Sequence, residues 1–290
     1  MRNILYLFIL VSIFTLGCED PIEVDLRDDK KELVIDAVLN NDSGIQKIIL
    51  TRTVGYFEPR GSNPPVSGAS IALLDADSFP YFFVESATEP GTYIYPNGQD
   101  FNRIGEQYGL VVASNGDTFV SISTMAPAAP LDSLLWRFES GNSFIDPYYE
   151  VEFAAKDLVG TGNTYFIRSF KNDTLLNSGE SANIAYDAAF SPGADFDGIE
   201  FIVPIRRIGI NDFDNTFQLG DKVEVQMMGI SNEFFLFLNL AEQQINNDGL
   251  FATPPSNVPS NFVNRTTSSE NRANGFFVIG ESNRISAIIQ

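Results

Sequence analysis

The sequence contains no histidine, and Cys18 is its single cysteine. The lack of histidine removes the commonest general base, the Ser-His and Cys-His nucleophile systems and the commonest zinc ligand. With one thiol, the chain forms no internal disulfide and no thiol-based metal site. The enzyme chemistry left open to such a chain rests mainly on carboxylates.

Positive charge is also scarce, with 18 lysines and arginines against 38 aspartates and glutamates and a net charge of −20. Removal of residues 1–17 as a signal, argued below, would take away Arg2 alone and leave 17 − 38 = −21. A surface this acidic repels nucleic acid and anionic lipid headgroups. We therefore exclude a nucleic-acid role and attribute the acidity mainly to solubility outside the cell.

The signatures of several enzyme classes are missing as well. The chain has no Walker loop, no Gly-x-Ser-x-Gly elbow and no Ser-x-x-Lys dyad. Gly160-x-Gly162 lacks the third glycine and the helix of a dinucleotide-binding loop, so we interpret it as a turn. We predict that the protein is not an enzyme. A hydrolase that uses two carboxylates stays open as an alternative, because their separation cannot be read from the sequence.

The N-terminus carries an apolar run over residues 4–16, followed by Gly17 and Cys18. This layout predicts a secretory signal peptide over residues 1–17, and the run is shorter than the roughly 20 apolar residues of a spanning helix. A cysteine directly after the cleavage point predicts lipidation of Cys18, as in bacterial lipoproteins. Residues 15–17 depart from the usual pattern, which has leucine three residues before the cysteine.

Residues 18–32 are predicted to form a lipidated acidic tether. Four carboxylates follow the anchor directly, at Glu19, Asp20, Glu23 and Asp25. They form a solvated linker, and they also match a sorting signal, because surface lipoproteins of Bacteroidota carry acidic residues after the lipidated cysteine. We therefore expect an outer-membrane, lipid-anchored protein that faces the cell surface, with the periplasmic leaflet as the alternative.

The first part of the remaining chain predicts a β-sandwich over residues 33–125. Short β-branched runs bounded by Asn, Asp and Gly recur along it, and Asn115-Gly116 is a tight hairpin turn. Two prolines at Ala126–Pro130 deny ladder hydrogen bonds and mark a domain boundary. The fold class predicted for the whole chain is all-β.

Residues 131–290 are predicted to form a second β-rich domain with one amphipathic helix. Its expected strands include 131–138 and a run over 199–210. Apolar residues fall at helical spacing near 232–246, after a capping Ser or Asn. We interpret the aromatic face of this helix as core packing against a sheet.

Calcium is the best candidate among metals. Asp195, Asp197 and Glu200 surround a turn glycine, and oxygen-bearing side chains recur at 211–215. Ca²⁺ takes six to eight oxygen ligands, which clustered Asp and Asn supply. Neither run has the full EF-hand spacing, and Asp, Asn and Gly also dominate ordinary turns, so a plain turn is the alternative.

Two further segments are candidates for binding. The loop 251–264 carries Phe251, Asn261 and Phe262 among prolines and asparagines, and a stiff, partly aromatic loop suits recognition of a partner. The alternative is that this loop packs across a sheet. Arg206-Arg207 is a basic pair in an apolar run, which either pairs with acids or binds an anion.

An ordered set of motifs gives the chain a resemblance to a known family. Over essentially the whole mature chain it resembles the Bacteroidota lipoprotein family labelled domain of unknown function 4249, and its N-terminal part is similar to immunoglobulin-like or transthyretin-like sandwich modules. The motifs are Cys18–Asp25, Leu33–Asp36, Val66–Ala69, Gly220–Val225, Ile230–Leu238, Phe251–Asn261 and Asn274–Phe277. The family has no established catalytic residues.

The resemblance implies an accessory role in nutrient uptake, because genes of this family often lie beside TonB-dependent outer-membrane receptors. We therefore expect a noncatalytic binding accessory to a TonB-dependent transporter. A structural or adhesive surface lipoprotein is the first alternative, and a carboxylate-based hydrolase is the second. No cofactor is expected, apart from the calcium candidate.

Overall fold

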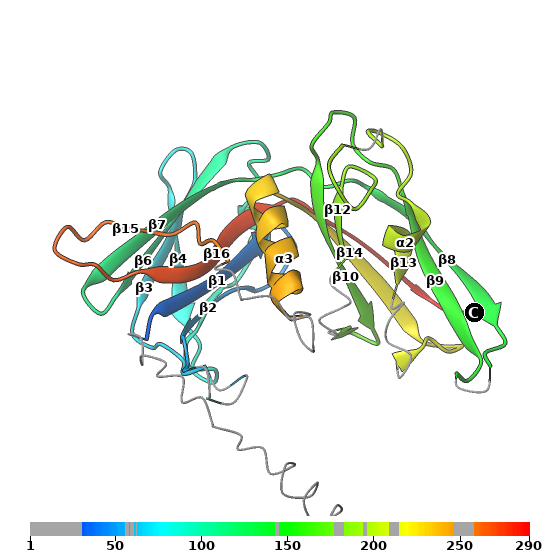
Figure 1. Cartoon of the computed structure of the whole chain (residues 1–290), viewed down its shortest axis with the longest axis horizontal. Helices are drawn as coiled ribbons and strands as arrows, with labels where there is room; N and C mark the ends of the chain where they lie inside the picture. Colours follow the sequence, from blue (N-terminus) through cyan, green and yellow to red (C-terminus); the bar gives the residue numbers. More distant parts are fainter. Residues whose placement is uncertain are drawn as a thin grey trace, which may run out of the picture. The chain divides into compact units, whose positions relative to one another are not determined.

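The computed structural model describes residues 31–55, 58, 61, 63–142, 145–176, 183–193, 196–208, 215–245 and 258–290 (Figure 1). The signal, residues 18–30 of the tether with Cys18, residues 211–214 and the candidates Asp195 and Phe251 lie outside these ranges. Strands dominate the described chain, which confirms the all-β prediction. Among the described residues, no helix has both the length and the apolar character needed to cross a membrane.

The first sheet has nine strands in the order β15-β7-β6-β3-β4-β5-β2-β1-β16. Its strands pair antiparallel except for β1 and β16, which run parallel from Leu33 opposite Ala273 to Asn40 opposite Gly280. Because β16 also packs against β7, the sheet curls back on itself. The elements are β1 (Leu33–Asn40), β2 (Gln46–Arg52), β3 (Ser70–Leu74), β4 (Pro80–Glu85), β5 (Thr92–Tyr95), the 3₁₀ helix η1 (Gly98–Asp100), β6 (Gln107–Ser114), β7 (Asp117–Thr124), β15 (Val263–Asn264) and β16 (Ala273–Gly280).

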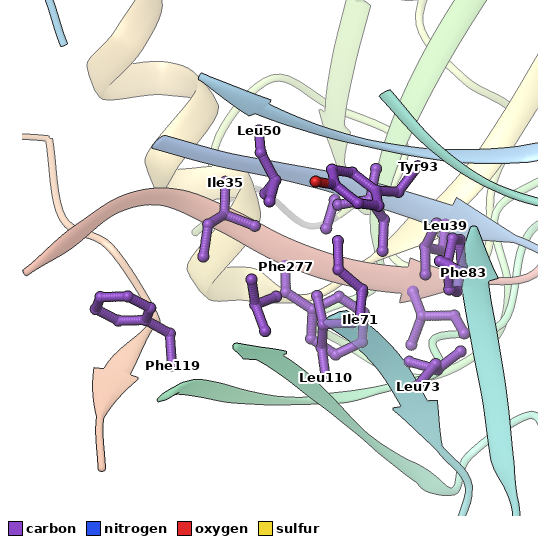
Figure 2. Close-up of a cluster of buried hydrophobic side chains, with 14 of the residues drawn as sticks. Ile35, Leu39, Leu50, Ile71, Leu73, Phe83, Tyr93, Leu110, Phe119 and Phe277 are labelled. Carbon is purple, nitrogen blue, oxygen red and sulfur yellow. The ribbon is translucent and has the colours of Figure 1, made fainter. Parts of the chain in front are cut away.

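The core of this sheet follows from the alternation of its strands. Ile35, Ala37 and Leu39 of β1 are fully buried, while the residues between them face outward, because successive side chains of a strand point to opposite faces. Figure 2 shows Ile35 and Leu39 among side chains of other strands, including Leu50 and Phe277. Full burial of one such side chain contributes about 1.5–3 kcal/mol.

The other strands form two sheets that share a second core. One has the order β11-β10-β14-β17, with β12 also paired to β10, and the other has the order β13-β9-β8. Phe153 of β9, Tyr165 of β10 and Val225 of β14 meet in one buried cluster, so the sheets pack face to face as a sandwich. The strands are β8 (Leu131–Glu139), β9 (Tyr148–Ala155), β10 (Thr164–Lys171), β11 (Thr174–Leu175), β12 (Asn183–Tyr186), β13 (Arg207–Ile208), β14 (Lys222–Ile230) and β17 (Ser282–Ile288).

Helix α3 (Asn232–Ile245) confirms the predicted amphipathic helix. The Ser231 hydroxyl accepts a hydrogen bond from the amide of Phe234 at 3.2 Å and so caps its first turn. Phe234 packs against Phe166 of β10 and Phe276 of β16, so one helix face joins a strand from each region. Figure 1 shows α3 beside these strands.

The strand predicted over 199–210 is wrong. Residues Val203–Arg206 form a short helix, α2, and the two residues of β13 follow it. A proline lies in the first turn of α2. Its fixed φ suits a helix start, and it cannot donate to a strand ladder. The run is mostly apolar, which is why the sequence predicts a strand where the structure has this short helix.

The last strands cross the boundary drawn at Ala126–Pro130. β15 and β16 come from the stretch assigned to the second domain, yet both pair into the first sheet. Gly229 and Gly280 allow the crossing, because a Cβ on Gly280 would lie 1.7 Å from the carbonyl oxygen of Gly229. The boundary peptide is held here too, since the Glu281 amide donates to the Ala126 carbonyl at 2.8 Å.

Candidate functional site

Of the two described members of the predicted calcium set, only Asp197 lies in a cluster of carboxylates. The Glu200 side chain is 80% exposed and pairs with an arginine at 3.8 Å. Asp197 instead lies beside Asp157 and Asp187, and one carboxylate oxygen from each lies within 4.8 Å of the other two. Sequence reasoning missed Asp157 and Asp187 because they are distant along the chain and belong to no recognisable metal motif.

The three carboxylates fasten loops together. Asp157 accepts hydrogen bonds from the Tyr165 hydroxyl at 2.6 Å and the Gly198 amide at 3.0 Å. Asp187 accepts two amides of the glycine-rich loop, from residues 162 and 163, at 2.8 and 3.0 Å. Asp197 accepts a third amide of this loop, from residue 160, at 2.7 Å. The turn predicted at Gly160-x-Gly162 is thus bound at three points.

Burial is the main influence on Asp157 in this group, which we call the aspartate clamp (Asp157, Asp187 and Asp197). It raises the pKa of Asp157, against the lowering effect of the bonds from Tyr165 and Gly198. Burial, followed by the bond to Asp157, also raises the pKa of Tyr165. Carboxylate oxygens are suitable ligands for Ca²⁺. Each of these side chains also accepts a hydrogen bond, so the clamp has a structural role in fastening the loops.

The two described residues of the partner-binding candidate are held by the first sheet. The Asn261 side chain donates to the Phe277 carbonyl at 2.8 Å and accepts from the Phe277 amide at 2.9 Å. Phe262 packs, partly buried, against the core of this sheet. These contacts favour the alternative in which the loop covers a sheet.

The basic pair is satisfied by acids. Arg206 pairs with Glu152 at 2.9 Å, and Arg207 pairs with Glu150 at 2.6 Å. Both glutamates lie on β9, beside β13. This arrangement favours the structural account of the pair over an anion site.

A cavity of about 760 Å³ lies beside α3, bounded by the outer face of β1 and β2, by β10 and by the helix. Sequence reasoning did not identify it. Its walls follow from strand alternation: β10 turns Tyr165 and Ile167 into the sandwich core and presents Phe166, Arg168 and Phe170 to the cavity. Cavities of this size hold small-molecule ligands in many proteins.

The wall near α3 is aromatic. Phe234 and Phe237 of the helix stack with ring centroids 5.7 Å apart, and both contact Phe276 of β16. Phe166 meets Phe234 edge to face at 6.4 Å. Val38 of β1 adds an aliphatic surface. This end of the cavity suits an apolar group.

The other end is polar, and one of its two arginines is paired. Arg284 contacts Asp42 at 2.6 Å and also pairs with Glu224. Gln226 lies between Arg168 and Arg284 in the strand register and donates to Asp42 at 2.5 Å. Asp42 therefore neutralises Arg284. Its contacts with Gln226 and Arg284 also connect β14 and β17 to the first region.

Arg168 differs from Arg284 at the same end. Within the described chain it makes no hydrogen bond or ion pair, and its Nε is buried without a partner. Its guanidinium lies over the Phe166 ring, 5.5 Å from the centroid. Burial lowers the pKa of Arg168, while Asp42 and Asp36 raise it. The Asp36 side chain is partly exposed, but the protein around it desolvates its carboxylate and so raises its pKa. The positive charge of Arg168 opposes this effect.

Comparisons with known proteins give a family but no activity. The family model described as Domain of unknown function (DUF4249) matches residues 19–285. No curated protein matches the chain. Among solved structures, a crystal structure of bovine butyrophilin is similar over 69% of this chain and 92% of that chain, at 10% identity and a TM-score of 0.21. A likeness this weak carries no argument.

Proposed function

This chain belongs to the DUF4249 family, and we propose that it is a bacterial outer-membrane lipoprotein that acts as a noncatalytic binding accessory to a TonB-dependent transporter. The family resemblance supports the transporter, and the sequence around Cys18 supports the anchor. The cavity beside α3 carries the binding role, because it combines an aromatic wall with an arginine that has no internal partner.

Anchoring is tested with Cys18→Ala in a strain that lacks the neighbouring receptor. The chain should leave the outer-membrane fraction, because two or three acyl chains contribute about 0.8 kcal/mol per buried CH₂ and no second anchor is expected. Continued sedimentation with the outer membrane would contradict the anchor.

Sorting is tested on intact cells with Glu19, Asp20, Glu23 and Asp25 all replaced by alanine. Lipidation should persist while access of an external protease to the protein falls. Unchanged access would leave the tether as a solvated linker only.

The transporter role is tested by purifying the tagged chain from native membranes and identifying co-purifying proteins. A TonB-dependent receptor is the expected partner. The alternatives predict other results: loss of cell adhesion on deletion for an adhesive protein, and turnover of a glycan panel for a carboxylate hydrolase.

A further inference from the structure

The cavity beside α3 contains a positive charge that the described protein does not neutralise. Arg168 has a buried Nε with neither a hydrogen bond nor an ion pair, in a chain with 38 acidic residues. A partly desolvated charge without a partner costs free energy. Packing alone therefore gives no reason for an arginine at this position.

The surroundings of Arg168 separate into two chemical zones. Phe166, Phe234, Phe237 and Phe276 form a continuous aromatic surface at one end. The guanidinium of Arg168 borders the same cavity and lies over the Phe166 ring, 5.5 Å from its centroid. A ligand that fits both zones has an apolar body and a group that accepts hydrogen bonds from a guanidinium.

We propose that this cavity binds a small amphiphilic monocarboxylate, with its carboxylate on Arg168 and its apolar body against the phenylalanines beside α3. A guanidinium pairs with a carboxylate through two parallel hydrogen bonds, which fixes orientation as well as charge. The inference rests on the proposed binding role and adds the ligand class to it.

The local charges favour one negative charge over two. Arg284 is already neutralised by Asp42 and Glu224, so it offers no second free cation. Asp36 and Asp42 also border the cavity and would repel a dianion such as a phosphate monoester. A ligand with a single carboxylate therefore matches the one unpaired guanidinium, that of Arg168, among the described residues that line the cavity.

Titration calorimetry tests this directly on the purified full chain with Cys18→Ala, which carries no acyl group and so needs no detergent. The probes are 4-phenylbutyrate and octanoate, each compared with its neutral amide. Both carboxylates should bind more tightly than their amides, and the better one shows whether the body is aromatic or aliphatic. Equal affinity for carboxylate and amide, or no binding of either carboxylate, would overturn the proposal.

Substitution of Arg168 assigns the charge. Arg168→Gln should weaken carboxylate binding by about tenfold to a hundredfold, the effect of losing a charge-assisted hydrogen bond, and leave the amides within about twofold. Arg168→Lys should restore part of the affinity. Arg265→Gln, at an exposed arginine away from the cavity lining, is the matched control and should bind as the wild type does.

A second variant moves affinity in the opposite direction. Asp36→Asn removes a negative charge from the cavity and should tighten carboxylate binding by about threefold to tenfold at low salt. Weaker binding in this variant, or unchanged binding in a folded Arg168→Gln protein, would refute the assignment. These measurements need neither membrane nor receptor, so their failure is distinguishable from failure of the transporter role.

Discussion

The nine-stranded sheet and the sandwich beside it treat a partly buried arginine in opposite ways. In the first region Arg103 contacts Asp75 at 3.4 Å, Asp77 at 2.5 Å and Glu106 at 3.3 Å. In the second, Arg168 has no acid within ion-pair distance among the described residues. The first region thus neutralises the charge of Arg103 with its own acids. The second leaves one available on the face that β10 turns to the cavity, which is where we expect a ligand.

The strongest way to break this comparison is to separate the two regions at their crossing. In Gly280→Ala the new Cβ would overlap the Gly229 carbonyl, and backbone atoms cannot move aside as a flexible side chain can. We expect a loss of about 3 kcal/mol or more in the free energy of unfolding, measured by urea denaturation.

Gly109→Ala is the control for that substitution. Gly109 is also a strand glycine, but nothing lies within 4 Å of its added Cβ. We expect a change within about 0.5 kcal/mol. Equal stability of both variants would mean that the regions do not meet closely at Gly280.

The aspartate clamp tests whether the second region satisfies its other charges. Asp157→Asn replaces one of the two carboxylate oxygens, which accept from Tyr165 and Gly198, by an amino group that cannot accept a hydrogen bond. It should lower the free energy of unfolding by about 1–3 kcal/mol at pH 7. Replacing Asp187 and Asp197 by alanine should lower the melting temperature in EDTA as well, because their hydrogen bonds to the loop amides need no metal. If Ca²⁺ raises the melting temperature of the wild type but not of these variants, the clamp is a cation site.

The raised pKa of Asp157 adds a dependence on pH. The folded state holds this proton at a higher pH than the unfolded chain does, so it binds more protons between the two pKa values. As the pH falls through the folded pKa, the wild type should therefore gain stability relative to Asp157→Asn, and the gain should level off below the unfolded value near 3.8. A difference between the two proteins that is independent of pH from 7 to 4 would contradict this account.

Asn261→Ala tests whether the C-terminal segment belongs structurally to the first region. The substitution removes both hydrogen bonds to the Phe277 backbone and should cost about 1–2 kcal/mol. Ser268→Ala, at an exposed residue of the same segment, should change little. A stable Asn261→Ala protein that loses receptor co-purification would instead restore the loop as a partner-binding surface.

Replacing the two arginines by methionine should give small changes in stability, but of opposite sign. Without ligand, Arg168→Met should stabilise the protein by about 1 kcal/mol, because it removes an unpaired charge from a partly desolvated site. Arg103→Met should destabilise it, because Asp75 is buried and would lose its cation. Both values come from urea denaturation, and a change of the same sign in the two variants would remove the distinction between the regions.

Local patterns predicted most of the fold. The strand predicted over 131–138 is β8, the Asn115-Gly116 turn appears with positive φ at both residues, and helical spacing predicted α3. The parallel pairing of β1 with β16 was not predictable, because no local signal links residues so far apart. The two-residue strands β11, β13 and β15 are too short to show a period.

The candidate site was less accessible. Its signal is present in β10, where Phe166, Arg168 and Phe170 alternate on one face, but a charge on a strand face is usually solvated. What makes Arg168 unusual is the absence of a partner, which depends on α3 and β1 packing nearby. The clamp likewise needs two loops to meet, the one after β9 and the one after β12. Such features are properties of the tertiary structure, and one segment of sequence does not contain them.

The pairing of β1 with β16 also constrains when the protein can finish folding. Leu33 faces Ala273, so 273 − 33 = 240 residues separate the two partners. A chain that is exported N-terminus first delivers β1 long before β16, and in that interval β1 presents an unpaired edge that invites aggregation. The first region can therefore reach its native state only after β16 is available. Along the proposed export route, the edge of β1 would need shielding until nearly the whole chain has crossed the inner membrane.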